Sequence, residues 1–320
     1  MPPIVIALVL TLLAASSAPG APGSAPRPHE GRGPVSVSGG RIHDEGAPTA
    51  PYEGRGFAPV NGGRLFYEVK GRGEPLVLIH GGQLDSRMWD DQFEAYAREF
   101  RVLRYDLRGY GGSTLPGEPY SNAEDLAALL DYLGMEKAHL VGLSLGGMVA
   151  TDFAVTHPDR VLSLVLSGPG LTGFDPESPE ENARYLAEIR AARDAPADSL
   201  VRLWLDDPLL AHAAAQPRLR PRLERMTREN VRGWLNNWLL QRLPRPATVQ
   251  RLAEIHVPTL LVVGDLDLPS VRATVDTLAR AVPGARTVVL HGAGHLANME
   301  MPAEFDAAVL GFLRSLRAGR

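Results

Sequence analysis

The chain has 320 residues, of which 44% are hydrophobic and 22% charged, the balance of a folded protein with a sizeable core. Its 33 basic and 37 acidic residues leave a formal net charge of −4 without a polybasic block, which argues against a nucleic-acid or anionic-membrane partner. The chain has no cysteine, which excludes disulfides, thiolate metal ligands and a cysteine nucleophile.

The N-terminus begins with an uninterrupted apolar run over residues 4–15, IVIALVLTLLAA, followed by small residues at 16–18. The run has the length of a signal-peptide core and is too short to span a bilayer comfortably. No Lys or Arg precedes it, and Pro19 follows at once, so a buried N-terminal segment is the alternative. We expect residues 1–18 to be a signal peptide and the protein to be secreted or periplasmic, with a cytoplasmic location as the alternative.

Residues 19–56 are rich in Pro, Gly, Ser and Ala and lack a periodic apolar pattern, which predicts an unstructured linker before a domain at 57–320. From about Gly63, short apolar runs alternate with helical patterns. Strands are predicted at 64–69, 76–80, 101–106, 139–144, 161–168, 260–265 and 286–292, and helices at 86–99, 121–133, 145–157, 270–281 and 302–317. This alternation, with several strands apolar throughout, predicts an α/β fold with a doubly wound, mostly parallel sheet.

One stretch, at about 171–250, breaks the alternation because it holds no strand-like run. Apolar residues recur there at helical spacing, including Leu203, Trp204, Trp234, Leu235, Trp238 and Leu239. An insertion of about 80 residues is too long for a plain connection between two strands. We therefore predict a helical cap inserted between strands, with its mixed charges on a solvated outer face.

The sharpest local motif is Gly142-Leu143-Ser144-Leu145-Gly146, a G-x-S-x-G at the point where a predicted strand ends and a helix begins. A nucleophilic serine needs this strand-to-helix turn, because the turn exposes the hydroxyl beside the N-terminus of the following helix. The motif predicts Ser144 as nucleophile and the N–H of Leu145 as an oxyanion donor. An ordinary Gly-rich turn is the alternative.

A serine hydroxyl requires a base, and His295 follows the last predicted strand, on the same sheet edge as Ser144. The base requires a carboxylate that orients its ring, and Asp265 and Asp267 both follow the strand at 260–265. The order Ser, Asp, His along the chain is that of α/β-hydrolases.

The second oxyanion donor should lie in the turn after the strand at 76–80. The sequence there is His80-Gly81-Gly82-Gln83, and the backbone N–H of Gly82 or Gln83 is the candidate donor. His80 itself fits a structural role in the turn better than a catalytic one.

From about Gly63 to its end, the chain resembles the α/β-hydrolase superfamily. The resemblance rests on five motifs in family order: HGG (80–82), YDLRGYGGS (105–113), GLSLGG (142–147), GDLD (264–267) and GAGH (292–295). The stretches HGGQLDSRMWDDQ and RYDLRGYGGS are most similar to the enol-lactonase, arylesterase and non-haem haloperoxidase-like branch. The resemblance implies that the catalytic acid is Asp267. It argues against epoxide hydrolase and haloalkane dehalogenase chemistry, for which relatives carry Asp at the position of Ser144.

We therefore expect a serine hydrolase that cleaves a carboxylic ester or lactone of small to medium size through an acyl-enzyme. We expect neither a cofactor nor a metal; the expected partner is a small-molecule ester or lactone substrate, with no nucleic acid and no stable membrane insertion, and the sequence does not determine the oligomeric state. A C–C bond hydrolase or peptidase with the same triad is the alternative enzyme. A non-catalytic ligand-binding protein on this fold is the alternative class.

Overall fold

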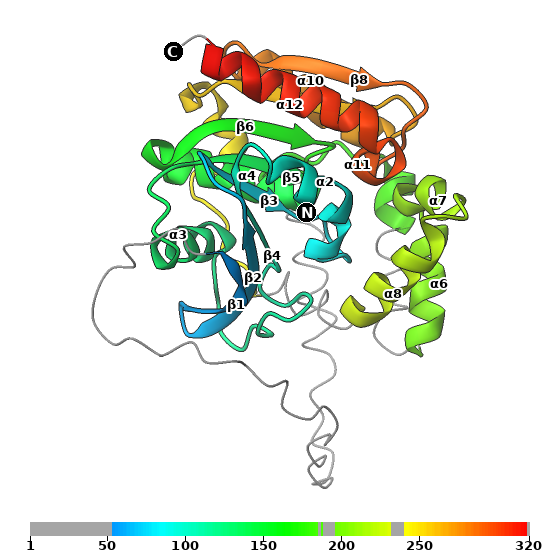
Figure 1. The fold of residues 1–320 in the computed structure, drawn as a ribbon. Coiled ribbons are helices and arrows are strands. Elements are labelled where there is room, and N and C mark those ends of the chain that lie inside the picture. The colour runs from blue at the N-terminus through cyan, green and yellow to red at the C-terminus, as the bar shows by residue number, and fades with distance from the viewer. Residues whose placement is uncertain (1–52, 185–186, 188–195, 232–239, 319–320) are drawn as a thin grey trace, which may run out of the picture.

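A computed structural model describes residues 53–184, 187, 196–231 and 240–318. The described residues contain one eight-stranded sheet in the order β1-β2-β4-β3-β5-β6-β7-β8 (Figure 1). β1, β2 and β4 pair antiparallel, and all other neighbours pair parallel. The strands are β1 Gly54–Val60, β2 Gly63–Lys70, β3 Pro75–Ile79, β4 Arg101–Tyr105, β5 Ala138–Leu143, β6 Val161–Ser167, β7 Thr259–Gly264 and β8 Arg286–Leu290.

The expected linker at 19–56 was wrong at its C-terminal end, because β1 begins at Gly54. This strand pairs with β2 through a tight hairpin in which Asn61 and Gly62 both have positive φ. An Asn-Gly turn between apolar residues is a strong hairpin signal. The glycines and Pro59 made this strand unrecognisable from its sequence pattern. Pro59 is tolerated because β1 is an edge strand and has a hydrogen-bonded neighbour on one side only. The predicted signal peptide at 1–18 lies outside the described residues.

Helices cover both faces of the sheet, as the alternating pattern predicts. β3 shows why, since Val77 and Ile79 belong to one hydrophobic core while Leu76 and Leu78 belong to the other. The first core includes residues of α3, α4 and α10, and the second includes residues of α2, α11 and α12. The bounds are α2 Asp90–Tyr96, α3 Asn122–Tyr132, α4 Leu145–Thr156, α10 Pro269–Ala281, α11 Ala297–Glu300 and α12 Pro302–Ala318. The expected doubly wound, mostly parallel α/β fold is confirmed.

The insertion between β6 and β7 is helical in its described part, as predicted. It contains α6 (Ala197–Asp206), α7 (Pro208–Ala214) and α8 (Arg220–Asn230). In Figure 1 these helices lie together beside α11, on the side toward which the β6 and β8 arrows point. Trp204 is fully buried and belongs to the second core, so this side chain packs the cap. The other aromatic positions expected in the cap, Trp234 and Trp238, lie outside the described residues.

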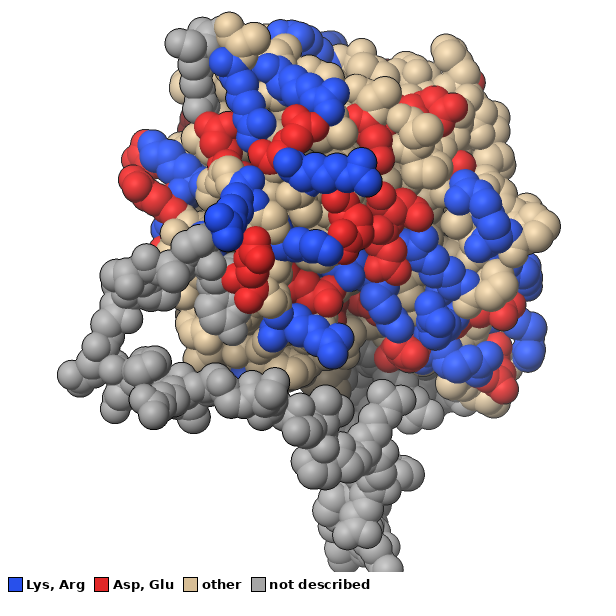
Figure 2. All heavy atoms as spheres, viewed as in Figure 1, with Lys and Arg blue, Asp and Glu red and all other residues tan. Residues whose placement is uncertain are grey.

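The surface seen in Figure 2 carries Lys and Arg interleaved with Asp and Glu, not separated into patches of one sign. Ion pairs between neighbouring elements occur in the described chain, including Arg314 of α12 with Glu99 and Arg222 of α8 with Asp91 of α2. Exposed pairs of this kind contribute little to stability, typically below about 1 kcal/mol. The mixed charge fits a solvated face.

Both ends of the cap insertion are joined at one buried carboxylate. Asp152 lies in α4 and is 3% exposed. It accepts hydrogen bonds from the hydroxyl of Thr172, near the start of the insertion (2.8 Å), and from that of Thr248, near its end (2.5 Å). Burial raises the pKa of Asp152 from its usual 3.8 to about 6, although the two hydroxyls oppose the shift.

Asp152→Asn is expected to change how stability depends on pH. The wild-type carboxyl is protonated more readily when folded than when unfolded, so its contribution to stability falls as pH rises from about 4 to about 6. The free energy of unfolding of the Asn variant, relative to wild type, should therefore rise by about 3 kcal/mol over the whole titration, of which about 2 kcal/mol falls between about pH 4.5 and pH 7.5. Urea unfolding of both proteins at about pH 4.5 and pH 7.5 measures this change. A constant difference would show that Asp152 does not titrate in this range.

Candidate active site

Ser144 stands on a strained turn between β5 and α4. Its φ of 54° and ψ of −114° are rare for a residue with a side chain and persist only where the surroundings impose them. The flanking glycines allow the turn because backbone passes very close to both. A Cβ on Gly142 would lie 2.3 Å from the carbonyl oxygen of Gly146, and one on Gly146 would lie 2.1 Å from that of Ile79. This is the geometry that the G-x-S-x-G motif predicts.

The turn also presents the N-terminus of α4 to the site. Leu145 is the first residue of this helix, so its N–H has no acceptor four residues earlier within the helix. Aligned backbone dipoles favour negative charge at that end. Leu145 is therefore placed where an oxyanion donor beside Ser144 is needed.

Asp267 and His295 form a buried pair on the same edge of the sheet. Asp267 follows β7 and His295 follows β8, and each residue is 6% exposed. The Nδ1 atom of His295 lies 2.9 Å from Oδ2 and 3.1 Å from Oδ1 of Asp267. Oδ1 also accepts the backbone N–H of Leu268 at 2.8 Å. This arrangement places the ring proton on Nδ1 and leaves Nε2 as the basic nitrogen.

The end of β6 connects this pair to Ser144. The backbone N–H of Ser144 donates to the carbonyl oxygen of Ser167 at 2.9 Å. The next residue, Gly168, has a φ of +46°, and a Cβ there would lie 3.0 Å from Oδ2 of Asp267 and 3.2 Å from Nδ1 of His295. Ser167 and Gly168 thus lie between Ser144 on one side and the Asp267–His295 pair on the other. Sequence reasoning missed Gly168, although a Gly at the end of a buried strand is a signal of close packing.

The electrostatics of His295 are those of a base beside carboxylates. Burial disfavours the imidazolium ion, but nearby carboxylates, Asp267 foremost, together raise the pKa of His295 above its usual value. Glu300 and Asp207 add smaller effects in the same direction. The imidazolium ion that forms when His295 takes a proton is thereby stabilised.

Asp265, the rival acid, has a different partner. Its side chain bonds to the N–H of Gly292 at 2.7 Å and to Nδ1 of His291 at 2.9 Å. The ring of His291 is 84% exposed. Asp265 therefore stabilises a surface turn, whereas Asp267 faces His295.

The loop after β3 lies next to the nucleophile turn. A Cβ on Gly81 would lie 3.6 Å from Cβ of Ser144, and one on Gly82 would lie 4.0 Å from Cβ of Leu145. Gln83 has a φ of 63°, a second strained backbone at the site. The N–H of Gly81 already donates to the sulfur of Met88 at 3.2 Å, which leaves Gly82 and Gln83 as the donors to consider.

His80 anchors this loop and is structural, as expected. Burial lowers the pKa of His80, so its ring is neutral at neutral pH. Its Nε2 accepts the N–H of Leu107 at 2.9 Å, and its Nδ1 lies 2.7 Å from the carbonyl oxygen of Gly81. The ring must therefore carry its proton on Nδ1 and donate it to Gly81.

Within the described ranges, no group of three or more His, Asp or Glu side chains is arranged to hold a metal ion. In the same part of the chain, no helix is both long enough and apolar enough to cross a bilayer.

Comparison with known proteins agrees with this architecture. Residues 76–308 match the α/β hydrolase family. The chain is 29% identical to carboxylesterase YbfK of Bacillus subtilis, covering 74% of this chain and 79% of that protein. It is 32% identical to a 2-hydroxy-6-oxononadienedioate/2-hydroxy-6-oxononatrienedioate hydrolase of Burkholderia vietnamiensis, covering 78% and 90%. Its fold is similar to that of the enol-lactonase from Burkholderia xenovorans, with a TM-score of 0.70, 29% identity and coverage of 81% and 100%.

The chain therefore belongs to the α/β-hydrolase family and is a hydrolase. The resemblance seen in its motifs, including that to the enol-lactonase branch, is confirmed. Ester and lactone hydrolases are among its relatives.

Proposed function

We propose that this protein is a serine hydrolase that cleaves a carboxylic ester or lactone through an acyl-enzyme. Ser144 attacks the carbonyl carbon while Nε2 of His295 takes the hydroxyl proton, and Asp267 stabilises the imidazolium ion. The N–H groups of Leu145 and of Gly82 or Gln83 hold the oxyanion of the tetrahedral intermediate. His295 returns the proton to the leaving oxygen, and a water molecule then repeats the sequence to release the acid. No step requires a cofactor.

The observation that carries this proposal is the strained Ser144 turn joined by Ser167 and Gly168 to a buried Asp267–His295 pair. A strained backbone at a serine lowers the stability of the fold. Strain of this kind is concentrated at functional sites, and on a sharp strand-to-helix turn it is typical of a nucleophilic serine. The carboxylesterase and enol-lactonase among the similar proteins support the choice of ester or lactone.

We further propose that the cap limits the substrate to small or medium size. The described cap helices lie on the side toward which the β6 and β8 arrows point (Figure 1), and the residues that follow β5, β7 and β8 lie at that edge, so we infer that the cap covers the approach to Ser144. A roofed pocket selects for size, whereas an open groove admits long chains. The buried position of Trp204 favours packing for that residue, so other parts of the cap would line the pocket.

A panel of p-nitrophenyl esters from acetate to palmitate, together with γ- and δ-lactones, tests both proposals. We expect hydrolysis of esters or lactones, with kcat/KM highest for short or medium acyl groups and falling toward palmitate. A kcat/KM that rose steadily with chain length would contradict the roofed pocket and leave the hydrolase in place. Absence of hydrolysis across the panel would contradict the ester and lactone proposal.

A C–C bond hydrolase is the second candidate, because the relative from Burkholderia vietnamiensis acts on an oxo-dienedioate. The same base and oxyanion donors would serve such a reaction. Adding a 2-hydroxy-6-oxo-dienoate to the panel decides between them: its turnover with kcat/KM well above that of every ester would favour this alternative.

We also propose that the protein is exported, and the apolar run at 4–15 is the observation that supports this proposal. The mature chain from its own host should then begin between about Ser16 and Ala25. N-terminal sequencing that finds an intact Met1 would contradict export.

A further inference from the structure

The two cap helices α7 and α8 and their connection, residues 208–230, contact both loops of the proposed catalytic site. We call this segment the cap arm. Its first helix bonds to the segment that carries His295, and its last residue bonds to the loop that carries Gly82 and Gln83.

Glu300 holds the loop of His295 from both sides. Its side chain is completely buried and accepts the N–H of Gly294 at 2.7 Å and the N–H of Leu296 at 2.9 Å. Those two residues flank His295 directly. Because both bonds are charge-assisted and buried, they restrict the backbone that carries the base more than neutral or exposed bonds would.

The cap arm supplies the third partner of this carboxylate. Nδ1 of His212, in α7, lies 2.5 Å from Oε2 of Glu300. Arg218 adds two bonds from the α7–α8 connection, to the carbonyl oxygens of Met299 (2.8 Å) and Glu300 (2.6 Å). A Cβ on Gly294 would lie 3.0 Å from Cβ of His212, so the cap arm packs directly on this loop.

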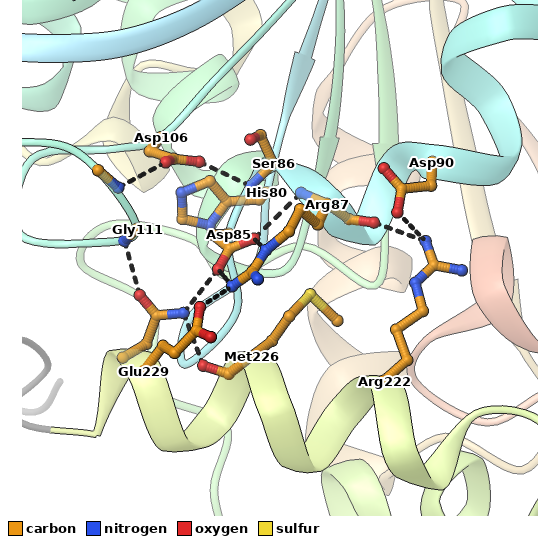
Figure 3. Close-up of polar contacts among 12 residues, drawn as sticks. His80, Asp85, Ser86, Arg87, Asp90, Asp106, Gly111, Arg222, Met226 and Glu229 are labelled. Carbon is orange, nitrogen blue, oxygen red and sulfur yellow. Dashed lines mark hydrogen bonds and ion pairs between the residues drawn. The ribbon is translucent and has the colours of Figure 1, made fainter. Parts of the chain in front are cut away.

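The other end of the cap arm reaches the oxyanion loop. Asn230, the last residue of α8, is 1% exposed. Its Nδ2 donates to Asp85 at 2.9 Å, and its Oδ1 accepts the N–H of Gly111 at 2.7 Å. Figure 3 shows the same junction, where Asp85 faces Arg87 and Arg87 faces Glu229 of α8.

Asp85 needs these donors because its carboxylate is buried. It lies two residues beyond Gln83, whose backbone is strained. Burial opposes its ionisation, but Arg87 and Asn230 hold the pKa of Asp85 below its usual value. An ionised, fully bonded Asp85 fixes the end of the oxyanion loop. Truncation of Asn230 to Ala would remove one of the two donors to Oδ2 of Asp85, the other being Arg87. It would also take the acceptor from the N–H of Gly111, so both side-chain bonds that Asn230 makes outside the cap arm would be lost.

We propose that the cap arm is a positioning element of the catalytic site: His212, through Glu300, aligns His295, and Asn230, through Asp85, aligns the oxyanion loop. This inference rests on the proposed serine hydrolase function. It makes the cap part of the catalytic geometry in addition to its role as a roof over the substrate.

The His212 end is tested with p-nitrophenyl butyrate and two substitutions. His212→Ala should lower kcat about 10-fold with KM changed less than about 3-fold, since only the alignment of the base is affected. His212→Asn should restore most of kcat, because its amide nitrogen can replace Nδ1 as the donor to Glu300. The control is Arg220→Gln, an exposed change on α8 whose partner is Glu224 of the same helix; it should match wild type.

The pH profile separates alignment of the base from general loosening of the cap. The carboxylates of Asp267, Glu300 and Asp207 all raise the pKa of His295. Glu300→Gln should therefore move the acid limb of kcat/KM to lower pH, because loss of a nearby negative charge disfavours the imidazolium ion. Asn230→Ala should lower kcat about 10-fold without moving that limb, since it acts on the oxyanion loop.

Three outcomes would overturn the inference: His212→Ala that matches Arg220→Gln in kcat, His212→Asn that fails to restore activity, or Asn230→Ala with wild-type kcat. His212 is partly exposed, so its variants should fold even if Glu300→Gln does not, and melting temperatures check this. If the wild type is active and the variants match it, the inference is overturned and the proposed function stands. A wild type that neither hydrolyses esters nor reacts with a fluorophosphonate overturns the proposed function as well.

Discussion

Ser144→Ala is expected to lower kcat for ester hydrolysis about 10⁶-fold and to abolish labelling by a fluorophosphonate. The variant loses the hydroxyl oxygen proposed to attack the carbonyl carbon, so no acyl-enzyme can form at this position. The fold should persist. Alanine keeps the Cβ atom and lacks only Oγ, and the backbone hydrogen bond from residue 144 to Ser167 needs no side chain.

Labelling with a fluorophosphonate followed by intact-mass measurement checks this expectation. Ser163→Ala is the control, because Ser163 is a fully buried serine in the neighbouring strand β6 whose hydroxyl bonds to His139. That variant should keep the full mass shift. A mass shift that persisted in Ser144→Ala would identify a different nucleophile.

Asp267→Asn is expected to lower kcat roughly 10⁴-fold. The N–H of Leu268 donates to Oδ1, so the amide oxygen of the new Asn takes that position and its NH₂ group faces Nδ1 of His295. A donor at that point forces the ring proton onto Nε2. The ring then cannot accept the proton of Ser144.

Asp265→Asn is the matched control, since it changes an exposed carboxylate two residues away that bonds to His291 and Gly292. Its kcat should stay within about 3-fold of wild type, because that turn does not contact His295. Steady-state kinetics of both variants with one p-nitrophenyl ester compares them. A larger loss in Asp265→Asn than in Asp267→Asn would reverse the assignment of the acid.

The secondary structure was largely predictable, and the exceptions have physical causes. Short apolar runs predicted seven of the eight strands of the described sheet, and the clearest of them, β5 and β7, are buried along their whole length as central parallel strands are. β1 was missed because an edge strand needs only one hydrogen-bonded partner and tolerates Gly and Pro59. The short helix α11 was also missed, since four residues are too few for a periodic signal.

By itself, the sequence determined the fold and the order of the candidate catalytic residues. Parallel strands end at one sheet edge, so residues that follow β5, β7 and β8 meet there whatever the details of packing. The family resemblance favoured Asp267 over Asp265, but only the tertiary structure gave the different partners of the two carboxylates. Only the tertiary structure joined the cap arm to both loops. His212 and Glu300 are 88 positions apart, and Asn230 and Asp85 are 145 apart. Isolated polar residues carry no periodicity, and whether they pair depends on how distant elements pack.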